Sequence, residues 1–162
     1  MGGTASTRTF DFAFHNLKGT DGQGIVDSVN NIIPDGNGAI YSGKHKPEDN
    51  LDCKDGNYAK HTGGRNTGNM GIALCGMWSP GYPIKRIQLE KACKLAAELC
   101  DKYGIRISNR TVLTHAEFGK QNPHTSSYGK IDIDKLPCVA VYGVTAVGNW
   151  IRNKVQWYKE RL

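Results

Sequence analysis

Several common signals are absent from this sequence, and each absence removes a class of protein. No apolar stretch approaches the roughly 20 residues that a membrane-spanning helix needs, so we expect no membrane insertion. The first eight residues lack the apolar centre of a signal peptide, so we expect synthesis in the host cytoplasm without an export signal. No Cys-x-x-Cys pair suggests a structural zinc site. No basic run interleaved with aromatic residues supports a nucleic-acid partner.

Cysteines are few, odd in number and scattered along the chain, which argues against a disulfide framework. Two of them lie seven residues apart within a helical pattern, which predicts that both occupy one buried helix face. We therefore expect free thiols in a reducing compartment. The five cysteines are Cys53, Cys75, Cys93, Cys100 and Cys138.

The composition is that of a globular protein, with 38% hydrophobic and 22% charged residues. A length of 162 residues fits one domain, 1–162, in which residues 1–8 are expected to be disordered. Twenty glycines predict many tight turns. The formal net charge of +6 favours an anionic partner: nucleic acid, an acidic wall polymer or a membrane surface.

Hydrophobic periodicity predicts two strands in the first half of the chain. Phenylalanines alternate with other residues from Thr9 to His15, which is the pattern of a half-buried strand with His15 at its end. A second strand is expected over 69–76, with small residues on one side, so that a neighbour can approach closely. The segment 25–33 fits a helix or a strand equally well, and 42–57 reads as a polar surface loop.

Two amphipathic helices are predicted in the second half. The first covers 84–103 and ends at Gly104, a typical stop residue. The second covers 145–162, with an apolar inner side and a basic outer side that includes Arg152 and Lys154. Its inner side comprises Val147, Trp150, Ile151, Val155 and Tyr158.

The most informative stretch runs from Thr111 to Pro137. It opens with an apolar run that ends at His115, followed by a polar loop that reaches the tripeptide Lys130-Ile131-Asp132. This order predicts a strand ending in a histidine and a loop that returns a carboxylate toward it. Imidazole and carboxylate groups suit zinc, and His15 is the best candidate for a third ligand.

Taken together, these segments resemble the type-2 family of zinc-dependent N-acetylmuramoyl-L-alanine amidases, which includes phage endolysins and the peptidoglycan recognition proteins. The resemblance covers most of the chain from Phe10 to Pro137. It rests on the strand ending at His15, the block Ala59-Lys60-His61-Thr62-Gly63-Gly64-Arg65-Asn66 with Met70-Gly71-Ile72-Ala73-Leu74-Cys75-Gly76, Gln88 at a helix start, and His115 with Lys130-x-Asp132.

The resemblance implies an α/β fold in which helices flank a central mixed β-sheet. It implies Zn²⁺ held by His15, His115 and Asp132, with Lys130 stabilising the oxyanion and with His61 and Asn66 lining the substrate groove. The reaction implied is hydrolysis of the amide between N-acetylmuramic acid and L-alanine in bacterial peptidoglycan. We expect a monomer that acts on the cell wall after release, as a bacteriolytic, antimicrobial endolysin does.

The sequence departs from the family pattern in three ways. The family's Gly-Tyr-His motif is missing, and Ala73 and Cys75 stand where some members carry a catalytic glutamate. The gap between His115 and Asp132 is also longer than usual, which implies an inserted loop. The general base therefore stays open among Tyr41, Glu48, Tyr58 and Glu117.

Three other functions fit parts of the sequence. A binding module for peptidoglycan without activity would share the fold but need no complete ligand set. A basic nucleic-acid-binding domain would show salt-dependent affinity and indifference to chelators. A metalloenzyme for another substrate would use the same ligands, because the fold does not determine function. Within the amidase reading, a secreted antibacterial effector would resemble a phage lysin.

Overall fold

The structure is a computed structural model that describes residues 9–15, 31–33, 39–60, 63–64, 66–75, 84–130 and 133–162. For β1, β2 and Cys75 it describes the backbone. The strands are β1 (Thr9–His15), β2 (Asn31–Ile33), β3 (Tyr41–Ser42), β4 (Asn69–Cys75), β5 (Val112–Thr114), β6 (Lys135–Leu136) and β7 (Val141–Tyr142). The α-helices are α3 (Arg86–Tyr103), α4 (His115–Gln121) and α5 (Val144–Lys159), and the 3₁₀ helices are η1 (Pro47–Leu51) and η2 (Pro137–Val139).

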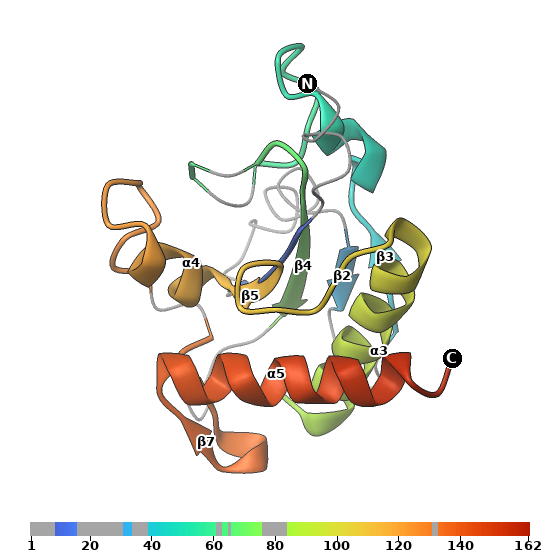
Figure 1. Ribbon diagram of the computed structural model, residues 1–162, viewed down its shortest axis with the longest axis vertical. Helices are drawn as coiled ribbons and strands as arrows, with labels where there is room; N and C mark the ends of the chain where they lie inside the picture. The colour runs from blue at the N-terminus through green and yellow to red at the C-terminus, as the bar shows by residue number, and fades with distance from the viewer. Residues whose placement is uncertain are drawn as a thin grey trace.

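A five-stranded mixed sheet forms the framework, in the order β3-β2-β4-β1-β5 (Figure 1). Strand β1 pairs in parallel with β4 on one side and with β5 on the other, and β2 is parallel to β4. Only β3 among the described strands of this sheet is antiparallel to its neighbour. The predicted strands at 9–15 and 69–76 and the α/β class are confirmed, and β2 resolves the end of the ambiguous segment 25–33 as a strand.

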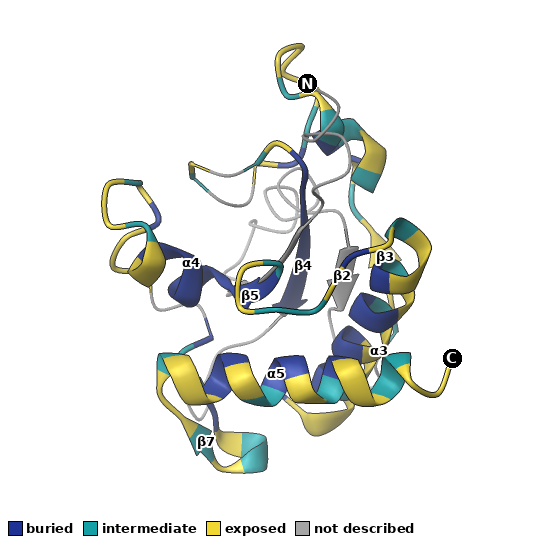
Figure 2. Ribbon diagram, viewed as in Figure 1, coloured by how far each residue is buried: buried dark blue, intermediate teal, exposed yellow. Residues whose placement is uncertain are grey.

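The hydrophobic core lies between the sheet and two helices, α3 and α5. Alternate residues of β4 point toward these helices, and Figure 2 shows the buried faces of α3 and α5 turned inward. Helix α3 ends at Gly104, whose left-handed backbone (φ 65°) is the predicted stop. The core includes Met70, Ile72, Leu74, Leu89, Ala92, Cys93, Ala96, Cys100, Val147, Ile151 and Val155. Among the described helices none is long and apolar enough to cross a membrane.

The cysteine prediction is confirmed for the thiols that the structure describes. Cys93 and Cys100 are free and buried on the inner face of α3, while Cys53 and Cys138 are free and half-buried. Burial raises the pKa of Cys93 and raises that of Cys100 to about 12, so both thiols stay protonated at neutral pH. These two thiols act as small packing groups.

The structure corrects three predictions about surface residues. Arg152, expected on the outer side of the last helix, is buried at 9% exposure against α4. The expected surface loop 42–57 contains η1, in which Asn50 is buried. His45, expected at the surface, is buried with its Nδ1 3.8 Å from Asp49 Oδ2. Each of these polar groups is buried because it has partners, which a hydrophobicity pattern does not register.

Candidate active site

The parallel pairing of β1 with β5 brings two predicted ligand positions to one edge of the sheet. Phe12 of β1 stands opposite Thr114, the last residue of β5, and β1 continues to His15. His115 follows Thr114 directly. Because the carboxyl ends of parallel strands meet at the same edge, and neighbouring strands are about 4.8 Å apart, both positions lie at one edge of the sheet.

His115 begins helix α4, which corrects the expectation that it ends the strand. The strand stops at Thr114 because this residue caps the helix: Thr114 Oγ1 accepts from the Glu117 amide at 3.0 Å, and Glu117 Oε1 accepts from the Thr114 amide at 3.1 Å. The sequence Thr-x-x-Glu is the signature of this capping box, so the start of α4 could have been predicted from the sequence. The box fixes the backbone of His115 at the edge of the sheet.

The imidazole of His115 is buried and has a defined proton arrangement. Its Nε2 lies 2.9 Å from Ser127 Oγ, and Ser127 Oγ donates to the Gly63 carbonyl at 2.8 Å. A carbonyl oxygen can only accept, so the single hydroxyl proton of Ser127 is used there. Ser127 therefore accepts from His115, which places a proton on Nε2.

This serine lies in the loop at 122–130, after α4, which the resemblance predicts to be an insertion and which we call the inserted loop. Lys130 lies at the end of the loop, exposed, and its amide donates to the Ser127 carbonyl at 3.2 Å. Asp132 lies outside the described residues. Just beyond it, Ile133 is buried with a positive φ of 57°, an unusual backbone for a β-branched residue. Asp134 Oδ1 is buried and has no hydrogen-bond partner in the described part of the chain.

The block that carries the predicted groove residues is organised by a buried side chain that the sequence did not reveal. Asn50 Nδ2 donates to the carbonyls of Ala59 and Asn66, at 2.9 and 3.2 Å, and Asn50 Oδ1 accepts from the Ala59 amide at 3.0 Å. Asn66 is thus held through its backbone and is half-buried. His61 lies outside the described residues, so its groove role stays a prediction.

A buried ion pair links α4 to α5. Arg152 of α5 donates to both carboxylate oxygens of Glu117, at 3.0 and 2.9 Å, and to the Val112 carbonyl at 3.0 Å. Gly148 makes room for this pair, because a Cβ built there would lie 2.2 Å from the Glu117 carboxylate. The pair ties β5, α4 and α5 together next to His115.

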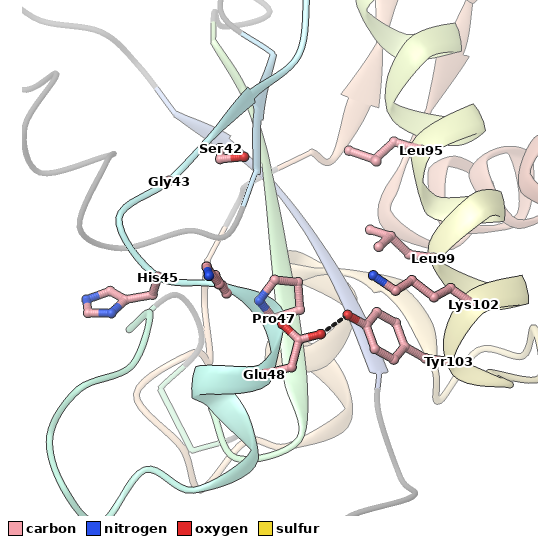
Figure 3. A pocket seen from close by; sticks show the side chains of 10 residues that line it. Ser42, Gly43, His45, Pro47, Glu48, Leu95, Leu99, Lys102 and Tyr103 are labelled. Atoms are coloured by element: carbon pink, nitrogen blue, oxygen red, sulfur yellow. Dashed lines mark hydrogen bonds between the residues drawn. The ribbon is translucent and has the colours of Figure 1, made fainter.

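The structure narrows the candidates for a general base. Glu117 is committed to Arg152 and to the helix cap, so its role is structural. Glu48 faces a separate pocket of about 290 Å³ beside α3, where it accepts a hydrogen bond from the Tyr103 hydroxyl (Figure 3). Tyr41 is exposed on the edge strand β3, and the ring of Tyr58 lies 5.5 Å from Lys60 Nζ. Tyr41 and Tyr58 remain open.

The donor set on this edge is chemically suited to zinc. A zinc-bound histidine usually donates its distal ring N–H to an oxygen, and the contact of His115 Nε2 with Ser127 Oγ would supply this bond. Among the side chains that the structure describes, no three His, Cys, Asp or Glu groups gather closely enough to hold a metal ion. Two of the three predicted ligands, the His15 side chain and Asp132, lie outside that set.

The positions of His15 and His115 lie at the carboxyl ends of adjacent parallel strands, which is where open α/β sheets usually bind their ligands. The model of the N-acetylmuramoyl-L-alanine amidase family matches residues 4–127 of this chain. The chain therefore belongs to that family, as the sequence analysis predicted. The match includes His15, His61, Asn66 and His115 and ends before Lys130. No curated protein matches the chain in a search of such proteins.

Proposed function

We propose that this protein is a zinc-dependent amidase that cleaves between N-acetylmuramic acid and L-alanine in bacterial peptidoglycan, as a phage-type cell-wall lysin. Family membership supports peptidoglycan amidase activity in general. The observation that carries the finer proposal is the parallel pairing of β1 with β5, which gives His15 and His115 a common sheet edge. The net charge of +6 suits an anionic cell wall.

In this proposal His15, His115 and Asp132 hold the ion. When bound, zinc supplies a Lewis acid that lowers the pKa of a bound water to about 7 and polarises the scissile carbonyl. The carboxylate of Asp132 follows Lys130 by two residues, so the Lys130 ammonium is available to stabilise negative charge on the carbonyl oxygen. Asn66 and His61 line the groove that orients the glycopeptide.

The test combines product analysis with metal analysis. Purified peptidoglycan is incubated with the protein, and new L-alanine amino termini are counted with and without chelator, alongside bound zinc per chain. We expect termini that disappear on chelation and in Asp132→Ala. The matched variant Asp134→Ala removes the same group two residues away and should keep activity. Wall binding without zinc or new termini would refute the enzyme proposal in favour of a binding module.

A further inference from the structure

We propose that Ser127, in the inserted loop, is a positioning residue that fixes the tautomer and orientation of His115. Its hydroxyl also couples His115 to the loop that contains Gly63, Gly64 and the predicted groove residue Asn66, here called the groove loop. This inference rests on the proposed function, in which His115 is a metal ligand. Ser127 does not itself touch metal or substrate in the proposal. It acts through the imidazole of His115.

The first argument is the direction of the hydrogen bonds. Since Ser127 Oγ donates to the Gly63 carbonyl, it presents only lone pairs to His115 Nε2. The Nε2-protonated tautomer of His115 is thereby favoured and Nδ1 becomes the ligating nitrogen. A ligand histidine held in this way is more basic and has one ring orientation.

The second argument is that the backbone of Ser127 is itself fixed. The residue is fully buried, and its carbonyl accepts from the Lys130 amide at 3.2 Å. The same carbonyl lies against Gly119 of α4, where an added Cβ would come within 2.0 Å of the oxygen. The hydroxyl is therefore presented from a clamped position, and the turn that clamps it also leads to Lys130.

The third argument is the contact between the inserted loop and the groove loop. A Cβ at Gly63 would meet Ser126 Oγ at 1.8 Å, and one at Gly64 would meet Thr125 Cγ2 at 2.6 Å. The two loops are thus in direct contact where the His115–Ser127–Gly63 chain crosses between them. A shift of the groove loop would be transmitted to the imidazole through the Ser127 hydroxyl.

The first experiment measures the tautomer in the metal-free full chain. Long-range ¹H–¹⁵N NMR of the His115 ring should show a proton on Nε2 in the wild type and a smaller share of this tautomer in Ser127→Ala. Ser127→Thr keeps the hydroxyl and should show the wild-type pattern. If the extra methyl group of threonine does not fit this buried position, Ser127→Cys has nearly the size of serine and should lie between the wild type and Ser127→Ala, because a thiol is a weaker hydrogen-bonding group. Ser42→Ala is the matched control, since this exposed serine lies on β3, at the opposite edge of the sheet from β5. A wild-type proton on Nδ1 would overturn the proposal.

The second experiment measures zinc affinity by competition with a chromogenic chelator, using the metal alone. Ser127→Ala should bind zinc about 10–100-fold more weakly, the usual effect of losing such a partner, while Ser42→Ala should match the wild type. Equal zinc affinity in wild type and Ser127→Ala would overturn the positioning role and leave the amidase proposal standing. If the wild type binds no zinc while the NMR results hold, the metal proposal fails and the hydrogen-bond role of Ser127 is supported.

Discussion

Helices α3 and α4 both pack against α5, but through different kinds of contact. Helix α3 meets α5 through small apolar groups, with Ala92, Cys93 and Ala96 against the stripe that includes Ile151 and Val155. Helix α4 meets α5 through Glu117 and Arg152, with Gly148 making room. Apolar contacts of the first kind are non-directional and set the fold, whereas the ion pair demands one geometry. The Glu117–Arg152 ion pair lies beside His115, whose side chain has to be held in one position in the proposed site.

Breaking the ion pair should have the largest effect on stability. In Arg152→Met the apolar stem is retained while the Glu117 carboxylate stays buried without its partner. Loss of one partner of a buried pair costs about 3–5 kcal/mol, a large part of the stability of a small domain. Denaturant unfolding monitored by circular dichroism gives the difference.

Two controls show whether the cost comes from the unpaired charge. Arg106→Met makes the same change at an exposed position and should alter stability by less than about 0.5 kcal/mol. The double variant Glu117→Gln/Arg152→Met removes both charges and should regain part of the loss. If Arg152→Met unfolds like Arg106→Met, the ion pair is not what holds α4.

The same comparison explains which parts of the fold could be predicted from the sequence. Helix α3 was predicted because its apolar face repeats over five turns and Gly104 ends it. Arg152 was assigned to the outside because amphipathic patterns treat every arginine as exposed, and its partner Glu117 is 35 residues away. Helix α4 has seven residues and no apolar period, although its capping box is visible in the sequence.

For the candidate site, the sequence predicted the positions of the two histidines, whereas the residues that support them were found only in the structure. The order of strands and histidines predicted that His15 and His115 belong together, and the parallel pairing of β1 and β5 agrees with this. Ser127 carried no signal, because a serine in a polar loop looks the same whether it contacts solvent or His115. The same is true of Asn50, whose amide organises a loop that begins nine residues away. Asp132, His61 and the role of Lys130 remain predictions.

Gly148→Ala tests how tightly α5 packs against the Glu117–Arg152 ion pair, and it should have an intermediate effect on stability. Helix propensity alone favours alanine over glycine by up to about 1 kcal/mol. The new Cβ would however lie 2.2 Å from a carboxylate that Arg152 holds in place. We expect the clash to dominate and a net destabilisation of about 1–3 kcal/mol, measured by thermal unfolding. Asn153→Ala, on the exposed side of α5, should be neutral or slightly stabilising, and a stabilised Gly148→Ala would contradict the packing argument.

The smallest effect is expected where α3 and α5 share a polar contact nearer to solvent. Tyr158 donates to Glu90 Oε2 at 2.6 Å, and Lys154 Nζ lies 3.1 Å from Glu90 Oε1. Burial alone would raise the pKa of Glu90, but the hydrogen bonds from Tyr158 and Lys154 outweigh it and lower the pKa. Burial and the bond to Glu90 raise the pKa of Tyr158 to about 12. Tyr158→Phe should therefore cost about 1 kcal/mol at neutral pH, because one hydrogen bond is lost near the surface.

The stability difference between wild type and Tyr158→Phe should depend on pH, which distinguishes the Tyr158–Glu90 contact from the buried Glu117–Arg152 pair. A group whose pKa rises on folding stabilises the protein below its unfolded pKa, here about 10, and the contribution is lost as the pH rises toward 12. The difference between wild type and Tyr158→Phe should thus be constant from pH 7 to 9 and shrink above about pH 10. Buried Cys100 titrates in the same alkaline range but is present in both proteins, so it cancels. A difference that persists unchanged at pH 11 would mean that the lost stability does not come from the hydrogen bond of the Tyr158 hydroxyl to Glu90.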